Sequence, residues 1–306
     1  MRLATWKFAA LFLALGMMLP AAALGSAPPA SYVLPGERVF PEGVAVLSGP
    51  GYFYVSSTED GTIFRGQLDE PQAEVFLPGG QDGRTTAGGL GVDPERNILY
   101  VSGGATGMVW AYDLRTRALL AQGANDYETT FINDVTITPD GSAYFTDSMQ
   151  PVIYRLSGAE TGNGEFEEWL DLEGTAVPFQ EGFNVNGIVS TPDGSALIVV
   201  HSSTGTLYHI DVEDQTVQQI DLGGATVQAG DGLVLRGDLL HVVQNALGQI
   251  TTVRLNPNML SGAVWSVFAD PNFRTPTTAA VLGDRLLVVN AQFSARQGTP
   301  ELPFSV

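Results

Sequence analysis

Four oxygen-bearing side chains recur at one position of a repeated segment, and together their chemistry suits a metal ion. Glu42, Asn133, Asn186 and Asp231 each begin a segment that continues with a small or polar residue and a short apolar run. Two carboxylates match the charge of a divalent cation, and two amide oxygens add neutral ligands, as in the oxygen shells that Ca²⁺ takes. Zinc would draw on His or Cys instead. The alternative is that these residues begin strands and satisfy turn backbone.

The segments that carry these residues form a regular series. Short runs of β-branched, aromatic and leucine residues alternate with Gly, Pro, Asp and Asn, and no sustained helical period occurs after residue 27, so we expect an all-β chain. The first residues of six aligned segments lie 46, 45, 53, 45 and 46 positions apart. The six segments are Glu42-Gly-Val-Ala-Val46, Gly88-Gly-Leu-Gly-Val92, Asn133-Asp-Val-Thr-Ile137, Asn186-Gly-Ile-Val-Ser190, Asp231-Gly-Leu-Val-Leu235 and Thr277-Thr-Ala-Ala-Val281.

A period of this length is typical of a β-propeller. A second strand is expected after each segment, and a third and a fourth in the first five units, which predicts a six-bladed β-propeller of four-stranded blades. The sixth unit has no obvious fourth strand. We predict that the N-terminal run 31–39 closes the last blade as its outer strand and covers the exposed edges. The alternative is that residues 28–39 are a linker.

Rotational symmetry would gather the six first residues in a ring at one mouth of the central channel. The ring predicts a Ca²⁺ site formed by Glu42, Asn133, Asn186 and Asp231. The ends of the second strands should surround the same mouth. His201 there offers a catalytic base, since imidazole titrates near neutrality, or it is a rim residue with no chemical task. Asp147 either orients a ligand-side amide or caps a turn.

These motifs resemble the calcium-dependent propellers of the gluconolactonase and senescence-marker-protein (regucalcin) group. Its wider relatives include paraoxonases and bacterial drug-response lactonases. The resemblance extends over about residues 40–292 and depends on the order and spacing of its motifs. The motifs are Pro41-Glu42-Gly-Val, Ile132-Asn133-Asp134-Val, Tyr144-Phe-Thr-Asp147-Ser148, Asn186-Gly187-Ile, Asp231-Gly232-Leu and the ending Asn290-Ala-Gln-Phe-Ser.

The resemblance implies that Glu42, Asn186 and Asp231 hold a catalytic Ca²⁺. It makes Asn133 either a fourth ligand or, beside Asp134, a contact to the substrate. The implied reaction is hydrolysis of a lactone or an ester, in which the metal polarises the carbonyl and Asp231 doubles as general base. The alternative is a non-catalytic, calcium-stabilised propeller that binds a ligand or a protein partner.

Two departures from the group narrow this expectation. Gly88 stands where paraoxonases have a histidine, so that route to a catalytic base is closed. The contacts that gluconolactonases make to a sugar acid have no clear counterpart beyond Asn133, so a sugar lactone is not the expected substrate. The chain also has no Gly-x-Ser-x-Gly motif and no cysteine, which disfavours serine- and cysteine-hydrolase chemistry.

Composition sets the expected compartment and partners. Arg2 and Lys7 flank an apolar run that is followed by small residues, so residues 1–27 are predicted to be a signal peptide that is removed, or alternatively an uncleaved anchor. Residues 28–306 are predicted to form a single propeller domain, secreted or periplasmic, with no stable membrane span. The formal net charge of −19 disfavours nucleic acid and anionic membranes as partners.

Overall fold

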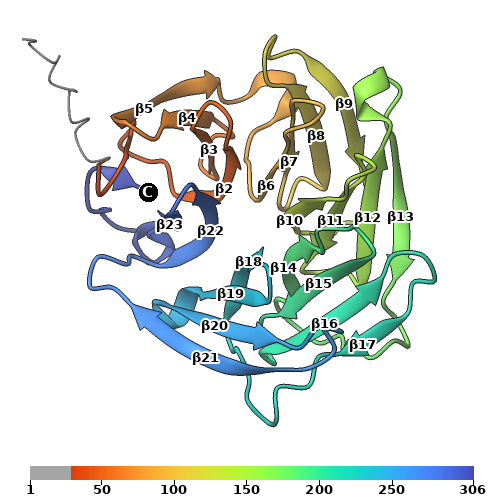
Figure 1. The fold of residues 1–306 in the computed structure, drawn as a ribbon. Coiled ribbons are helices and arrows are strands. Elements are labelled where there is room, and N and C mark those ends of the chain that lie inside the picture. The colour runs from red at the N-terminus through yellow and green to blue at the C-terminus, as the bar shows by residue number, and fades with distance from the viewer. Residues whose placement is uncertain (1–28) are drawn as a thin grey trace, which may run out of the picture.

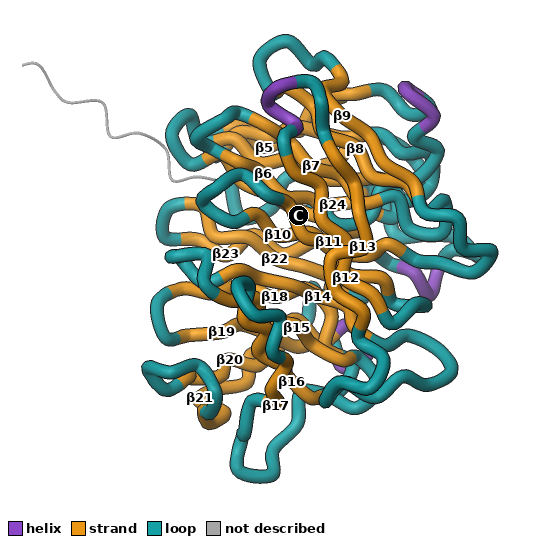
Figure 2. The backbone as a smooth tube through the Cα atoms, turned by 90° about the vertical axis from the view of Figure 1, so that its right-hand side faces the viewer, coloured by secondary structure: helices purple, strands orange, loops and turns teal. Residues whose placement is uncertain are grey.

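The protein is a β-propeller whose sheets stand around a central axis (Figure 1). The computed structural model describes residues 29–306, so the signal peptide predicted at 1–27 lies outside the described residues. Strands predominate and helices occur only as short 3-10 segments (Figure 2), which confirms the all-β prediction. The 3-10 segments are η1 (Gln81–Gly83), η2 (Ala159–Thr161), η3 (Asn245–Leu247) and η4 (Phe293–Ala295).

Five blades each contain four antiparallel strands in sequence order, with the first strand nearest the axis (Figure 1). Blade one is β2 (Pro41–Leu47), β3 (Tyr52–Ser57), β4 (Ile63–Gln67) and β5 (Glu70–Leu77), and blade two is β6 (Leu90–Asp93), β7 (Ile98–Ser102), β8 (Met108–Asp113) and β9 (Leu119–Ala124). Blade three is β10 (Ile132–Ile137), β11 (Ala143–Asp147), β12 (Val152–Ser157) and β13 (Glu165–Asp171). Blade four is β14 (Val185–Ser190), β15 (Ala196–His201), β16 (Thr206–Asp211) and β17 (Val217–Gln219), and blade five is β18 (Gly230–Arg236), β19 (Leu239–Gln244), β20 (Gln249–Leu255) and β21 (Gly262–Ala269).

The prediction of six blades is wrong, because the sixth repeat does not form one. This repeat forms only a two-stranded sheet of β22 (Pro276–Leu282) and β23 (Arg285–Asn290). The chain then enters η4 and a loop that contains Pro300 and Pro303. Because proline lacks the N–H needed for a strand ladder, this loop does not extend the sheet beyond β23.

The prediction that the N-terminal strand closes the last blade is also wrong. Strand β1 (Val33–Leu34) pairs antiparallel with β24 (Phe304–Ser305) and parallel with β5 of blade one. Buried aromatic rings hold these terminal strands. Tyr32 packs edge-on against Phe53, with 4.8 Å between ring centroids, and Phe304 lies fully buried in the same apolar cluster.

A one-residue bulge interrupts the first strand in five of the six repeats. In blade three the register passes from Ile132 opposite Asp147 to Val135 opposite Phe145, so three steps along β10 match two along β11. The same irregularity occurs in β2, β14, β18 and β22. Each bulge contains the predicted ring position, and bulges re-aim side chains. The bulges therefore give the repeated polar residues a common direction.

Glycine follows the ring residue where neighbouring first strands approach closely. A Cβ on Gly43 would lie 2.5 Å from the carbonyl oxygen of Gly88, and one on Gly187 would lie 2.1 Å from that of Asp231. Real side chains do not tolerate such contacts, so only glycine fits. The glycine of the repeated motif therefore serves the packing of blade against blade.

The apolar core consists of layers between neighbouring sheets. Separate clusters join blades one and two, two and three, three and four, and four and five. Another cluster joins blade one to β22, β23 and the terminal strands, and Thr277 Oγ1 donates a hydrogen bond of 2.8 Å to the carbonyl oxygen of Glu42. With a smaller cluster between blade five and β22, these contacts close the ring of sheets. Within residues 29–306, no helix has the length and apolar character needed to cross a membrane.

Candidate functional site

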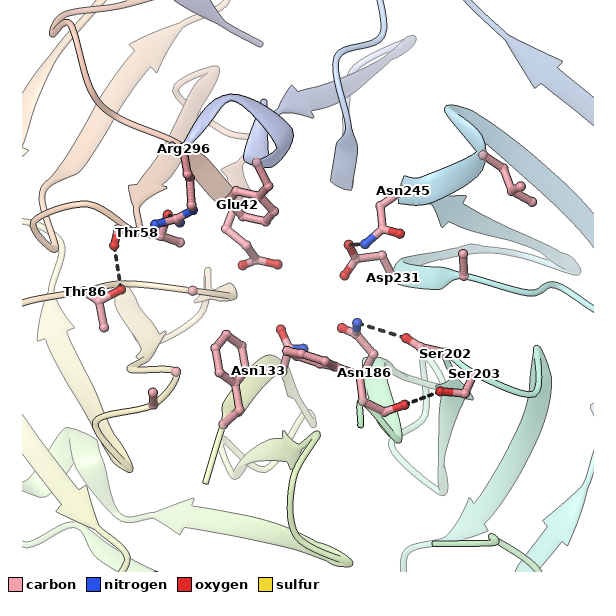
Figure 3. Close-up of a pocket in the computed structure, with 18 of the residues that line it drawn as sticks. Glu42, Thr58, Thr86, Asn133, Asn186, Ser202, Ser203, Asp231, Asn245 and Arg296 are labelled. Atoms are coloured by element: carbon pink, nitrogen blue, oxygen red, sulfur yellow. Dashed lines mark hydrogen bonds between the residues drawn. The ribbon is translucent and has the colours of Figure 1, made fainter. Parts of the chain in front are cut away.

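One cavity of about 860 Å³ is lined by all four side chains that were predicted from the sequence to be metal ligands. Glu42, Asn133, Asn186 and Asp231 come from the first strands of blades one, three, four and five, and Figure 3 shows them directed toward a common space. The remaining lining comes from the loops at the same end of the blades. The cavity therefore lies on the propeller axis, where the first strands begin.

The two amide side chains are oriented by serines that follow the second strand of each blade. Asn133 Nδ2 donates to Ser148 Oγ at 2.9 Å, and Asn186 Nδ2 donates to Ser202 Oγ at 3.1 Å. Each serine hydroxyl already donates to a backbone carbonyl, at 2.7 Å for Ser148 and 2.5 Å for Ser202, so it accepts from the asparagine. The amide nitrogen is thus fixed, and each Oδ1 is left for the cavity (Figure 3).

Asp231 is held by a residue at the equivalent position of blade five. Asn245 Nδ2 donates to Asp231 Oδ2 at 2.7 Å (Figure 3). Asn245 directly follows β19, as Ser148 follows β11 and Ser202 follows β15. The sequence motifs gave these three residues no predicted role. The repeat alignment contains the signal for them, one residue beyond the end of each second strand.

Two buried oxygen atoms of this set have no hydrogen-bond partner among the described residues. They are Glu42 Oε2 and Asn186 Oδ1. Buried polar atoms almost always have a hydrogen-bond partner or another ligand, so each of these two oxygens needs one. Both atoms can only accept hydrogen bonds. One belongs to a carboxylate and the other to a neutral amide, and either oxygen can bind a metal ion. A hard cation in the cavity would satisfy both.

The electrostatics of the carboxylates also favour a bound cation. Burial raises the pKa of Glu42 well above its usual range, and the negative charges of Asp231 and Asp134 raise it further. Burial raises the pKa of Asp231 to about 8, with the hydrogen bond from Asn245 opposing the shift and the charge of Asp134 adding to it. None of the ion pairs formed by residues 29–306 includes either carboxylate. A divalent cation would relieve this repulsion.

The ligand set depends on amide oxygens. In the described part of the chain, no group of three or more His, Cys, Asp or Glu side chains is placed to hold a metal. Two carboxylates and two amides are nevertheless a suitable donor set for Ca²⁺, which accepts neutral oxygens readily. The same set is a poor one for zinc, which prefers nitrogen and sulfur.

Asp134, predicted to contact the substrate, does not line the cavity. Its carboxylate accepts hydrogen bonds from the backbone N–H groups of Val135 at 2.9 Å and Ile188 at 3.2 Å, so it joins β10 to β14. Burial raises its pKa to about 7, and the two backbone hydrogen bonds oppose that shift. Asp134 therefore influences the site through its charge and through the packing of two blades.

His201 and Asp147 are both fully buried outside the cavity lining. His201 Nε2 lies 3.0 Å from the carbonyl oxygen of Pro178, and Nδ1 accepts from the backbone N–H of Thr204 at 3.4 Å. Both ring nitrogens are thus engaged by backbone, and burial lowers the pKa of the imidazole. We assign His201 no catalytic role.

Asp147 organises the loops around it. Its carboxylate accepts backbone hydrogen bonds from Phe131 at 2.9 Å, Met149 at 2.8 Å and Gln150 at 3.1 Å, together with a hydrogen bond from the hydroxyl of Thr130. These donors account for the acceptor capacity of the group, so the structure places it as a loop anchor. Of the two roles considered for Asp147, orientation and capping, these bonds support capping.

Apolar side chains form another part of the cavity wall, which sequence analysis did not identify. The rings of Phe131 and Phe183 meet edge to face with 5.1 Å between centroids, and Leu247 and Phe293 also line the cavity. All four lie in loops or 3-10 segments outside the repeated strands. Their positions carry no repeat signal, because each loop has its own length and sequence.

Comparison with known proteins supports the fold. A scan of protein-family models finds no match, and neither does a search of curated proteins. Among solved structures, the chain is similar to the allergen Mala s 1 of Malassezia sympodialis, with a TM-score of 0.69 and 14% identity over 90% of this chain and 95% of that one. It is also similar to a catalytically inactive virginiamycin B lyase from Staphylococcus aureus solved with quinupristin, with a TM-score of 0.62 and 15% identity over 85% and 80% of the two chains.

A third similar structure is the nidogen/laminin complex, with a TM-score of 0.58 and 16% identity over 78% of this chain and 86% of that one. These neighbours are β-propeller proteins. At such identities the similarity concerns the fold alone. The chain is therefore a β-propeller protein, and its function has to be argued from its own cavity.

Proposed function

We propose that the chain is a calcium-dependent hydrolase of the gluconolactonase and senescence-marker-protein group, acting on a lactone or an ester in the axial cavity. The observation that carries the proposal is the pair of orphaned buried oxygens, Glu42 Oε2 and Asn186 Oδ1, beside a second buried carboxylate on Asp231. Such a set is costly without a cation and favourable with one. Secretion or export to the periplasm fits this proposal and stays a prediction.

The proposed ligands are Glu42, Asn186 and Asp231, with Asn133 either a fourth ligand or a contact to the substrate. When bound, Ca²⁺ would polarise the substrate carbonyl and stabilise the negative charge that develops on its oxygen. Asn245 holds Oδ2 of Asp231, which leaves Oδ1 to take the proton of an attacking water. The phenylalanine pair at the wall would bind the apolar part of the substrate and exclude water.

The test combines calcium binding with hydrolysis. Purified residues 28–306 should bind about one Ca²⁺ tightly by calorimetry, as one such site requires. A panel of lactones and aryl esters should then be hydrolysed with calcium and not after chelation. Glu42→Gln should lose both binding and hydrolysis, whereas the exposed-site control Glu70→Gln should keep both.

Three outcomes separate the possibilities. Absence of calcium binding at millimolar Ca²⁺ would refute the metal site. Hydrolysis that persists in Glu42→Gln would place catalysis elsewhere. Calcium binding that raises the unfolding temperature without hydrolysis of any panel member would leave a calcium-stabilised propeller that binds a ligand or partner.

A further inference from the structure

Arg296 brings a positive charge to the cavity that the repeated strands do not supply. It directly follows η4 and lines the same cavity as Glu42 and Asp231 (Figure 3). Every other lining side chain in the described part of the chain is acidic or uncharged. The residue comes from the segment after the last repeat, so rotational equivalence does not predict it.

The guanidinium group of Arg296 is held in place without an acidic partner. Its Nη2 donates to Thr58 Oγ1, which itself donates to the carbonyl oxygen of Phe40 at 2.5 Å. Its central carbon lies 4.8 Å from the ring centroid of Phe293 and 5.1 Å from that of Phe40. No ion pair found among residues 29–306 includes Arg296. Aromatic contacts and one hydroxyl therefore fix a cation that still has donors to offer.

The backbone of Arg296 is fixed as well. Arg38 Nη2 donates to the carbonyl oxygen of Arg296 at 3.1 Å, and Arg38 Nε pairs with Glu59 at 2.8 Å. Glu59 is thus engaged by a different arginine. Together with the side-chain contacts to Thr58, Phe40 and Phe293, this fixed backbone limits the rotamer freedom that anion binding would otherwise have to remove.

The charges and the apolar surface of the cavity together indicate which kind of ligand it would bind. A divalent cation would balance Glu42 and Asp231, and Arg296 would remain as the one charged side chain of the lining without a counter-charge in that lining; the charges of Glu59 and Arg38 nearby act on it in opposite senses. Phe183 and Leu247 also line the cavity and keep 44% and 54% of their surface exposed. Apolar surface of this kind in a concave site favours an apolar ligand body.

We propose that Arg296 binds a carboxylate of the substrate, so that the substrate is an apolar lactone or ester carrying one negative charge. One charge on the ligand matches one guanidinium, and a planar carboxylate suits its fork of donors. The reaction part of this inference rests on the proposed hydrolase function. The binding of a carboxylate by Arg296 does not, and it is tested separately.

The kinetic experiment compares two esters that differ only in charge. Wild-type protein with Ca²⁺ is assayed on 4-nitrophenyl hydrogen glutarate and on its methyl ester. We expect the acid to be favoured in kcat/KM by about tenfold or more, as for a hydrogen bond to a charged group. Arg296→Gln should abolish the preference through KM, and Arg296→Lys should keep part of it. The control Arg254→Gln, at an exposed position of β20 outside the cavity lining, should leave it unchanged. A preference that survives in Arg296→Gln overturns the proposal.

The binding experiment needs no turnover. Calorimetry on the calcium-loaded protein compares 4-phenylbutanoate with 4-phenylbutanamide, and with phenyl phosphate as a dianionic probe. The carboxylate should bind best, and Arg296→Gln should weaken it by about tenfold while the amide is unaffected. This result in a protein that hydrolyses nothing would refute the hydrolase and support the anion site. Equal binding of carboxylate and amide, or tighter binding of the phosphate, refutes the carboxylate site. Thermal unfolding of each variant reports whether it is folded.

Discussion

The two sides of the cavity are built differently. On the side of blades three to five, Asn133, Asn186 and Asp231 stand in bulged first strands, and each is anchored by the residue that follows the second strand of its own blade. On the side of blade one, Glu42 Oε2 has no partner among the described residues. The residue equivalent to those anchors there is Thr58, and it accepts from Arg296 instead.

The difference separates what the repeat provides from what the non-repeated segments provide. Rotation of one motif places oxygen donors and their anchors at equal positions, so the proposed metal site is a property of the repeat. Arg296 and Phe293 come from the chain after β23, and Phe131 and Phe183 from inter-blade loops. We infer that the repeat would determine the chemistry and the loops would determine the substrate, as is common when loops carry specificity on a rigid scaffold.

The largest expected effect comes from removing a proposed ligand on the repeated side. Asp231→Asn keeps the shape of the side chain but removes one of the two charges that the cation would neutralise. We expect calcium affinity to fall by more than about 100-fold, beyond the loss typical of a supporting residue. Calorimetric titration measures it. Calcium affinity within a few-fold of wild type would show that the metal is elsewhere.

The anchors test the comparison directly. Asn245→Ala should lower calcium affinity by about 10-fold to 100-fold, because Asp231 would lose the partner that orients it. Thr58→Val removes the equivalent residue of blade one, where the hydroxyl contacts Arg296. It should leave calcium affinity nearly unchanged and reduce the preference for the charged ester. If both variants lower calcium affinity equally, then Thr58 supports the metal site as Asn245 does, and the two sides of the cavity do not differ in this way.

Protons compete with calcium for the carboxylates of Asp231 and Glu42. This competition should have a third, smaller effect, on the free energy of unfolding and on calcium affinity. The pKa of Asp231 is raised to about 8 and that of Glu42 is raised well above its usual range, mainly by burial. Calcium-free folded protein thus binds more protons than the unfolded chain between about pH 4 and 8, so its free energy of unfolding should fall as pH rises through that range.

Saturating calcium should remove much of this pH dependence, because metal binding requires the deprotonated ligands. Calcium affinity itself should rise with pH over the same range. Urea unfolding at several pH values, with and without Ca²⁺, measures both effects. A matched series on Asp231→Asn should show a weaker pH dependence without calcium. Identical pH dependence in the two proteins would contradict this account of the carboxylates.

The smallest expected effect on activity is at His201. Because both ring nitrogens are engaged by backbone and the side chain lies outside the cavity lining, His201→Gln should change kcat/KM by less than about twofold once folding is confirmed. A large loss of kcat with unchanged thermal stability would restore the catalytic role that the sequence suggested. The pH profile of kcat would then lose a step below the ordinary range of an imidazole, because burial lowers the pKa of His201.

The four oxygen-bearing positions predicted from the sequence lie in one cavity. The residues expected to surround them were placed one position too early in the chain. Sequence reasoning assigned His201 and Asp147 to the mouth because they end second strands, and the structure instead puts Ser202 and Asn245 in the cavity lining, with Ser148 buried behind Asn133. Successive side chains of a strand point to opposite sides, so an error of one position exchanges buried for cavity-facing residues. The bulges add to the difficulty, since each shifts the pairing by one residue and leaves no unambiguous mark in the sequence.

What the sequence by itself determined is the part of the protein that repeats. Spacing and composition predicted the all-β propeller and the four oxygen-bearing positions that the structure gathers in one cavity. The tertiary structure decided where the terminal strands lie, because β1 pairs with β5 of blade one and with β24, and Tyr32 packs against the distant Phe53. It also decided that Arg296 reaches the cavity. Contacts of this kind depend on how non-local segments pack, and local sequence periodicity carries no information about them.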